Sequence, residues 1–577
     1  MSAQSLTNAP KPELTADLDA DLNYDVLVVG SGAGGAMAAY ELTRQGQRVL
    51  LLEAGRDYDP KKETPMFRRN SDAPLMGAAT PDKDFGFYDA TVDGGWQVPN
   101  EPYTAAAGSE FMWWRARMLG GRTNHWGRYA LRFSPHDFKG KSRDGLGADW
   151  PFEYDDIAPW YDKTELLVGI CGTNTGLDDM PPSPDGVLQP PPKARIPELL
   201  VAAAAKKHGI TAVPMHRAVL TRPKDQRAAC FYATSCGYGC SIGAAFQTTT
   251  SLLPMALATG LLTIKTNAMV KSVDTDDGGK VTGVTFIDKT NGLPVQLPAR
   301  VVILAASACE SARILLNSAS NKHPRGLANS SGQVGKNLMD STGANFGAYV
   351  PALMDRPLYN EDGHTANHLF IPWWGHQLQA EKKLDFPRGY HFELGGRFTE
   401  PGAYTSAPLQ GYGHDLRRQV RQHYGAYVSF ALRGEMLPNE HCYMELDPLV
   451  KDKWGIPVAR FHWRWSEHEL KQVAHGLATA KLLLETMGAT PGPLPSPEQA
   501  ILKGGQVIHE VGTTRMGASA ADSVTNQWGQ TWDCDNLFVM DGGVFASNPH
   551  KNCTLTILTL AMRNSDYLAR QLREGRL

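Results

Sequence analysis

Three of the eight cysteines of this 577-residue chain lie close together, at Cys230, Cys236 and Cys240. Three thiols could form a disulfide, ligate zinc or ligate a redox-active cluster. A disulfide would leave one thiol over. Zinc prefers four ligands, commonly in paired C-x-x-C units, whereas this loop has C-x5-C-x3-C spacing and no fourth Cys or His. Structural thiols and iron–sulfur ligands therefore both stay open, and the rest of the chain must decide.

A second chemical motif lies near the start, in "YDVLVVGSGAGGAMAAYELTRQGQRVLLLEAG". Residues 25–29 are nearly all apolar, as in a strand buried on both faces of a parallel sheet. Gly30, Gly32 and Gly35 follow in G-x-G-x-x-G register and open a helix predicted over 36–45. These glycines make the tight turn, admit a pyrophosphate to the backbone and let the helix lie close to the sheet.

A second apolar strand, predicted at 49–52, ends at Glu53. An acid at this position accepts hydrogen bonds from the hydroxyls of an unphosphorylated ribose. The complete strand–glycine–helix–strand–acid unit therefore predicts a Rossmann-like dinucleotide site. It favours FAD or NAD over NADP and does not separate the first two.

Size and composition set the wider limits. A chain of 577 residues is too long for one core, so two or more domains are expected. A net charge of −3 with scattered Lys and Arg gives no reason to expect nucleic acid as a partner. The longest apolar runs are much shorter than the roughly 20 residues of a membrane span, and the N-terminus has no basic and apolar signal pattern.

The elements that must position these residues can also be predicted. Residues 261–305 indicate short strands with a hairpin at Asp277-Gly278-Gly279. Residues 346–464 alternate between apolar and polar residues, as do antiparallel strands with one solvent-exposed face. Residues 466–487 predict a long amphipathic helix with Ser466 as its N-cap and Glu469 completing a capping box.

Five separated blocks resemble the glucose–methanol–choline (GMC) oxidoreductases. Besides the opening unit they are "MLGGRTNHWGR" at 118–128, "VVILAASACESARILLNS" at 301–318 with "GLANSSGQVGKNLMD" at 326–340, "HEVGTTRMG" at 509–517 and "DGGVFASNPHKNCTLTILTLAMRNSDYL" at 541–568. They occur in the family's order and span nearly the whole chain. The resemblance decides for FAD as the cofactor.

The resemblance also implies an α/β fold of two domains, a Rossmann-like FAD-binding domain and a substrate domain built on an antiparallel sheet. We expect a polar arm at 1–22 and a discontinuous FAD domain at 23–345, with a loop-rich insert at 136–194 and the cysteine loop at 229–241. The substrate domain is expected at 346–504, and 505–577 returns to the FAD domain.

Oxidising an alcohol with a flavin needs a base for the hydroxyl proton, and histidine suits that task because its pKa lies near working pH. By resemblance, His509 is the catalytic base and Asn552 its partner, with hydride passing to flavin N5. Cys553 replaces a proline that the sugar-oxidising branch often has. His550 is the alternative partner if the register slips by two residues.

The remaining cofactor contacts come from the same resemblance. Gly121, Asn124 and His125 in "GGRTNHW" should lie at the flavin, and His125 resembles a histidine that some relatives link covalently to it. Asp541 and Gly542 in "MDGG" should approach the pyrophosphate or ribityl chain.

The cysteine loop resembles that of membrane-linked glucose, fructose and gluconate dehydrogenases, where it holds a [3Fe–4S] cluster. This implies that Cys230, Cys236 and Cys240 ligate such a cluster, and that electrons leave to a cytochrome subunit in an assembly with a small helper subunit. Thiols that have lost the cluster are the alternative.

Further blocks are most similar to enzymes that oxidise the C3 hydroxyl of glucosides and other pyranoses. The leading hypothesis is therefore a sugar or glycoside dehydrogenase, with a peroxide-forming oxidase and a non-redox flavoprotein lyase as alternatives. Without a signal of its own, the chain is expected to reach the periplasm with a signal-bearing partner; a cytoplasmic enzyme is the alternative.

Overall fold

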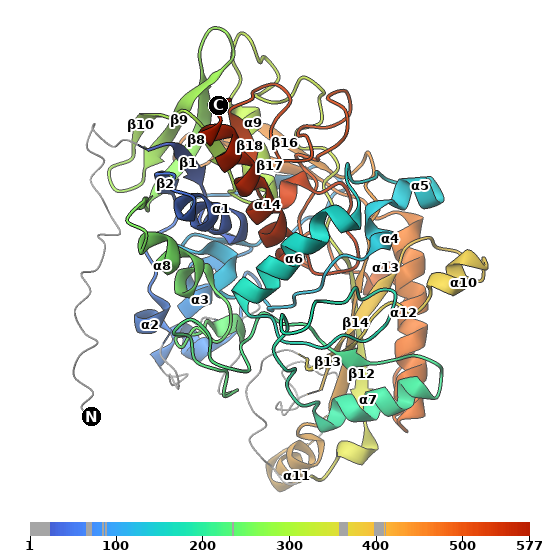
Figure 1. Ribbon diagram of the computed structural model, residues 1–577. Coiled ribbons are helices and arrows are strands. Elements are labelled where there is room, and N and C mark those ends of the chain that lie inside the picture. Colours follow the sequence, from blue (N-terminus) through green and yellow to red (C-terminus); the bar gives the residue numbers. More distant parts are fainter. Residues whose placement is uncertain are drawn as a thin grey trace.

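A computed structural model describes residues 24–64, 72–83, 86, 89–232, 236–356, 367–396, 409 and 411–577. The predicted arm at 1–22 lies outside them. Most of the buried apolar side chains form two large clusters, one around a parallel sheet and one under an antiparallel sheet. Figure 1 shows the helices and strands of both regions. The predicted fold class, α/β with two domains, is confirmed.

The parallel sheet holds the first strand at its centre, in the order β18-β11-β1-β2-β7. Its strands are β1 (Val26–Val29), β2 (Val49–Leu52), β7 (Leu262–Lys265), β11 (Val302–Leu304) and β18 (Leu537–Val539). The chain runs outward from β1 to β2 and β7 on one side, and to β11 and β18 on the other. In such sheets the crevice at the carboxyl ends of the strands where the order reverses is the usual ligand site.

Helix α1 (Ala33–Arg44) begins directly after the first glycines, three residues before the predicted start. A Cβ on Gly35 would lie 1.9 Å from the carbonyl oxygen of Gly30, and one on Gly34 would lie 1.7 Å from that of Met540. Only glycine therefore lets this helix lie so close to the sheet. Helix α14 (Thr554–Arg573) packs along α1, and α6 (Tyr154–Val168) packs along α14.

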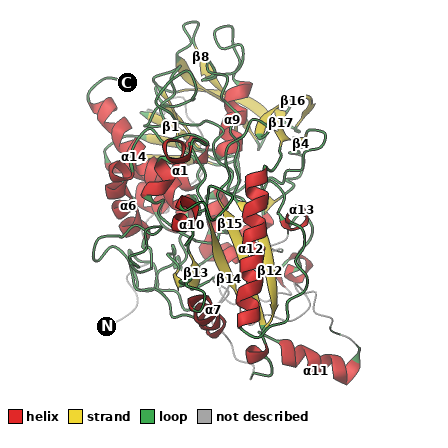
Figure 2. Ribbon diagram, turned by 90° about the vertical axis from the view of Figure 1, so that its right-hand side faces the viewer, coloured by secondary structure: helices red, strands yellow, loops and turns green. Residues whose placement is uncertain are grey.

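The second large sheet is antiparallel, in the order β12-β15-β14-β13-β6. Its strands are β6 (Val213–Pro214), β12 (Thr342–Tyr349), β13 (Leu369–Ile371), β14 (Tyr390–Gly395) and β15 (Tyr427–Gly434). Helix α12 (Glu467–Thr486) packs on β12 and β15 (Figure 2). Its predicted capping box is confirmed, since the Glu469 carboxylate accepts from Ser466 N at 2.8 Å and the Ser466 side chain accepts from the backbone N–H of Glu469.

Two segments cross the predicted domain boundaries, which themselves stay a prediction. Strand β6 comes from the part assigned to the FAD domain yet pairs with β13, and α7 (Ile196–Lys206) packs on α12. Strand β12 begins four residues before the expected start of the substrate domain.

Smaller sheets and short helices complete the described residues. The hairpin at Asp277-Gly278-Gly279 is confirmed, since β8 and β9 pair antiparallel around it. The smaller sheets are β8 (Ala268–Thr275), β9 (Val281–Asp288) and β10 (Leu293–Pro298); β4 (Thr104–Ala105), β16 (Tyr443–Lys451) and β17 (Pro457–His462); and β3 (Gly94–Gly95) with β5 (Arg115–Ala116). The other α-helices are α2 (Pro60–Glu63), α3 (Asp89–Val92), α4 (Pro135–Phe138), α5 (Gly140–Asp144), α8 (Leu252–Leu257), α9 (Ala308–Asn317), α10 (His376–Ala380), α11 (Gly413–His423) and α13 (Pro497–Ala500). Among the helices of the described residues, none has the length and apolarity needed to cross a bilayer.

Candidate active site

A cavity of about 670 Å³ lies where the two large sheets meet. On one side it is lined by the carboxyl ends of β1, β2 and β11, through Val29, Leu52 and Ala305. On the other side it is lined by Glu393 of β14 and Arg433 of β15. The cavity therefore joins the crevice expected for a dinucleotide to the sheet expected to hold a substrate.

The dinucleotide motif lines this cavity as the sequence predicts. Gly30, Gly32 and Glu53 all face it, and Gly35 lies behind them against the sheet. A Cβ on Gly32 would meet no atom within 4 Å, so the space beside this residue is open toward the cavity. The Glu53 carboxylate accepts from Ser31 N at 3.1 Å and from Gly55 N at 2.7 Å, which fixes the turn. The open glycine edge and the buried acid fit the adenosine end of FAD.

The C-terminal "MDGG" segment reaches the same cavity. Asp541 and Gly542 line it, and the Asp541 carboxylate accepts from Gly543 N at 2.8 Å and from Ser311 Oγ. Burial raises the pKa of Asp541 to about 6, although the Ser311 hydroxyl and neighbouring backbone amides lower it. A raised pKa makes it easier for this carboxyl to take up a proton beside a phosphate.

Of the three residues expected at the flavin from "GGRTNHW", two line the cavity and one does not. Gly121 and His125 line the cavity. His125 Nε2 accepts from the indole Nε1 of Trp114 at 2.9 Å, so a flavin bond through Nε2 would break this contact. Asn124 is not among the cavity-lining residues; its amide donates to Leu119 O at 2.8 Å and braces the loop.

His509 and Asn552 come together on the cavity wall. Asn552 Nδ2 lies 3.4 Å from His509 Nε2, and His509 Nδ1 lies 2.9 Å from Ser341 Oγ. An amide nitrogen can only donate, so Nε2 must accept and the ring proton is on Nδ1, where it can donate to the Ser341 hydroxyl. This tautomer presents an unprotonated nitrogen to the cavity.

The backbone beside His509 is strained and held by one carboxylate. Ile508 has a φ of +66°, a left-handed conformation that is rare for a β-branched residue. Asp340 accepts from His509 N at 2.9 Å and from Val507 N at 3.2 Å, on both sides of the strained residue. Such strain persists where the surroundings over-determine it, and it often marks a functional site.

Glu393 contributes a negative charge beside His509 and Asn552. It lies 3.2 Å from Asn552 Nδ2 and 3.4 Å from Arg433 Nη2. Burial raises its pKa, but Arg433, His391 and Asn552 outweigh that effect and hold the pKa at about 2. Desolvation by the surrounding protein lowers the pKa of His509 to about 3, while the Glu393 charge opposes that shift. His509 is therefore neutral at physiological pH and has a stabilising anion nearby.

Sequence reasoning missed Glu393, Arg433 and Asn367, all of which line the cavity. One signal was present: His391 and Glu393 stand two residues apart in an apolar strand, so both project from the same face. His550, the alternative partner, does not line the cavity. Its Nε2 lies 3.3 Å from Asp179 Oδ1.

The three cysteines of the loop lie together around Val219, Ala244 and Ala245. Cys236 lines the cavity, and Arg217 Nη2 lies 3.8 Å from its sulfur. Burial raises the pKa of Cys230 to about 11 and also raises that of Cys240. Among the described residues, which omit 233–235 of this loop, no group of three His, Cys, Asp or Glu side chains could hold a metal ion.

Comparison with known proteins gives the family. Residues 24–342 and 438–561 match the N- and C-terminal parts of the GMC oxidoreductases. The chain is 32% identical to 2-methyl-1,2-propanediol dehydrogenase of Mycolicibacterium austroafricanum, across 95% of this chain and 96% of that protein. It is 26% identical to the fructose dehydrogenase large subunit of Gluconobacter japonicus, across 96% and 99%.

Solved structures share the fold. A variant of Aspergillus oryzae formate oxidase, described with a modification of its FAD, superposes with a TM-score of 0.64 at 14% identity, across 96% of this chain and 99% of that one. The glycine crevice, the acid at Glu53 and the family match agree on the cofactor, which is FAD. The chain therefore belongs to the GMC oxidoreductase family and is an enzyme that acts on CH–OH groups of alcohols or sugars.

Proposed function

We propose that this enzyme oxidises a secondary hydroxyl of a sugar or glycoside, at C3 of a pyranose ring, to a ketone, with His509 as the base. The observation that carries the proposal is the placement of His509 Nε2 and Asn552 Nδ2, 3.4 Å apart, on the wall of the FAD cavity. A substrate hydroxyl between them can donate its proton to Nε2 and accept from the amide.

The residues around this pair prepare it for proton transfer. The Ser341 contact at Nδ1 sets the ring orientation, and the Asp340 carboxylate fixes the backbone of His509. Desolvation by burial keeps the imidazole neutral in the resting enzyme, as a base requires. The Glu393 carboxylate then stabilises the imidazolium once the proton has arrived. Bound FAD would accept the hydride from the substrate carbon that carries the reacting hydroxyl.

The polar lining supports a polyhydroxylated substrate. Glu393, Arg433 and Asn367 bring a carboxylate, a guanidinium and an amide to the cavity. Sites built to hydrogen-bond several hydroxyls reject analogues that lack them, because buried polar groups are then left unpaired. Among the relatives, C-glycoside 3-oxidase of Arthrobacter globiformis matches 23% of the chain at 32% identity, which supports C3 as the position.

Anaerobic bleaching of the flavin tests this function. We expect methyl glucosides to bleach it, their 3-deoxy counterparts to fail, and nuclear magnetic resonance of the product to show a 3-keto group. His475→Gln serves as a control, because His475 is a partly buried histidine that hydrogen-bonds Tyr390 and does not line the cavity. Bleaching by 2-methyl-1,2-propanediol with none by any sugar would refute the proposed substrate class.

We also propose that electrons leave through a [3Fe–4S] cluster on Cys230, Cys236 and Cys240 to a cytochrome-bearing partner, with a small helper subunit, on the periplasmic side. The resemblance of the cysteine loop and a relative named as a large subunit support this, although the described residues do not bring three metal-ligating side chains together. Iron analysis and low-temperature paramagnetic resonance of anaerobically purified protein provide the test. Full flavin with no iron, and oxygen uptake that yields peroxide, would replace the dehydrogenase with an oxidase.

A further inference from the structure

A row of ionisable side chains leads from the active-site cavity through the interior to the surface. Glu393 lines the cavity, and its Oε1 lies 3.7 Å from His391 Nε2. The ring of His391 lies 5.8 Å, between centroids, from the ring of His550. His550 Nε2 lies 3.3 Å from Asp179 Oδ1, and that oxygen lies 3.4 Å from His376 Nε2.

The middle of this row is buried and short of partners. His391 has no exposed surface, and neither of its ring nitrogens has a hydrogen-bond partner among the described residues. The same holds, within the described chain, for His550 Nδ1 and Asp179 Oδ2. Buried polar atoms are normally paired, so these groups leave hydrogen-bonding capacity that a water molecule or a passing proton can use.

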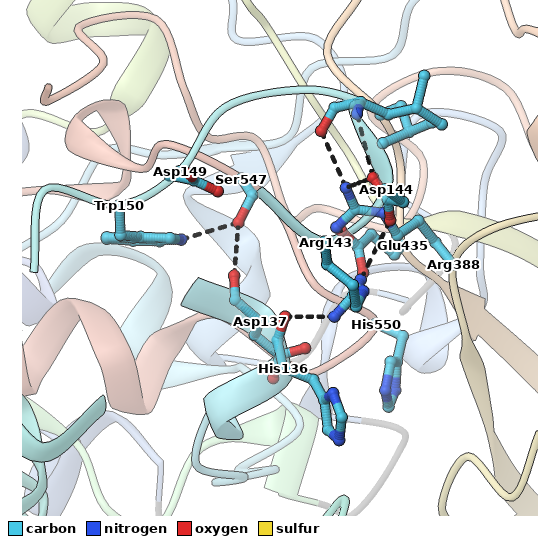
Figure 3. A network of polar contacts seen from close by, with 12 residues as sticks. His136, Asp137, Arg143, Asp144, Asp149, Trp150, Arg388, Glu435, Ser547 and His550 are labelled. Carbon is cyan, nitrogen blue, oxygen red and sulfur yellow. Dashed lines mark hydrogen bonds and ion pairs between the residues drawn. The ribbon is translucent and has the colours of Figure 1, made fainter. Parts of the chain in front are cut away.

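A lysine and two carboxylates surround His550. Lys551 Nζ donates to Asp179 Oδ1 at 2.7 Å and to Asp137 Oδ2 at 2.9 Å, and it lies 3.2 Å from His550 Nε2. Burial and the Lys551 ammonium lower the pKa of His550 to about 4, although Asp179 and Asp137 oppose that shift, so the ring is neutral at rest and holds a proton only in passing. Figure 3 shows Asp137 and His550 in the same region as Arg388 and Glu435, which pair with one another.

The far end of the row reaches solvent. The His376 side chain is 29% exposed and its ring stacks on that of the exposed His136, with centroids 4.5 Å apart. A cavity of about 10 Å³, lined by Asp179, His550 and Lys551, has about the volume of one water molecule. A proton on Asp179 can therefore pass to the partly exposed His376.

We propose that the proton taken from the substrate hydroxyl leaves the active site through Glu393, His391, His550 and Asp179 to His376. This inference rests on the proposed function. In the reaction the substrate C–H bond breaks with its electron pair, which passes as hydride to FAD. The O–H bond breaks too, its proton goes to His509 Nε2, and a C=O bond forms. That proton is the one to be exported.

The first step from His509 to Glu393 is short. Both contact the same Asn552 nitrogen, at 3.4 and 3.2 Å, so Nε2 and Oε1 lie within about 6.6 Å of one another. Both residues line the cavity, where one water can bridge them. The bound substrate stands on the cavity side of His509, so an exit through the protein keeps the path open during turnover.

The test compares two signals in one anaerobic stopped-flow experiment on the holoenzyme in weak buffer. Flavin absorbance reports hydride transfer, and a pH-indicator dye reports the proton in bulk solvent. In the wild type we expect one proton per flavin, released at the rate of bleaching. In His391→Ala and Asp179→Asn we expect bleaching within a few-fold of wild type, while proton release lags by about tenfold or more, the scale of a lost proton-transfer group.

Added imidazole should restore simultaneous release in His391→Ala, because it can occupy the space left by the ring, and it should leave Asp179→Asn unchanged. His475→Gln is the matched control and should show no lag. Release in step with bleaching in both relay variants would overturn the inference while leaving the proposed function intact. Flavin that no alcohol bleaches would overturn the proposed function and the inference with it. If His391→Ala does not fold, His391→Gln takes its place in the same comparison.

Discussion

Replacing Glu393 by glutamine removes the negative charge that most favours the protonated form of His509. The amide keeps the size of the side chain and an oxygen that can still accept from Asn552, so the change isolates the charge. The carboxylate oxygen lies within about 6.6 Å of His509 Nε2, since both atoms contact the same Asn552 nitrogen at 3.2 and 3.4 Å.

At an effective dielectric constant of about 20, two unit charges at this distance interact with about 2.5 kcal/mol. Each 1.36 kcal/mol corresponds to a tenfold change in rate, so Glu393→Gln should slow flavin reduction by about 70-fold. The pKa of His509 should fall further, because its protonated form loses its anion. The acid limb of the kcat/KM profile should therefore move to lower pH.

Single-turnover flavin reduction, measured across pH with equal FAD loading, provides the assay. Glu445→Gln is the control, because this half-exposed carboxylate pairs with His462 in a different sheet. A rate within about threefold of wild type and an unshifted acid limb would refute the electrostatic role of Glu393.

Other outcomes follow from the site. His509→Ala should lower turnover by about 10²–10⁴-fold with FAD still bound, the span of a lost general base, and activity within a few-fold of wild type would place the base elsewhere. Yellow colour that stays with acid-precipitated protein and disappears in His125→Ala would establish a covalent flavin bond at His125; colour found wholly in the supernatant would exclude it. Burial and the nearby Glu510 charge raise the pKa of Asp340 to about 7 in the folded protein. The stability that the neutral Asp340 carboxyl contributes is complete below its unfolded pKa of 3.8 and is lost as the pH rises from there to about 7, so thermal melts of Asp340→Asn should depend less on pH between about 4 and 7.

Local patterns were enough to predict the dinucleotide unit. The apolar strands, the glycines and Glu53 lie within one stretch of chain, and each imposes its own conformation. The capping box at Ser466 is local in the same way, and its helix begins and ends within a residue of the prediction.

The substrate side could not be predicted this way because it depends on contacts between distant segments. Glu393 meets Asn552 across 159 residues, and Asp340 holds His509 across 169. Neither short segment has a sequence pattern that indicates its distant partner. The pairing of β6 with β13 is equally non-local, since a two-residue strand carries too little pattern to reveal the sheet it joins.

The position of β18 has a consequence for synthesis. This strand forms the edge of the parallel sheet beside β11, and the segment that follows it supplies Asp541, Asn552 and helix α14. When a ribosome has made the first 530 residues, β18 and α14 have not yet been synthesised. One edge of β11 is therefore unpaired, and α1 lacks its packing against α14. Such edges invite aggregation. The flavin pocket can close only when the last residues emerge, which makes cofactor loading a late event and the C-terminus a poor place to truncate.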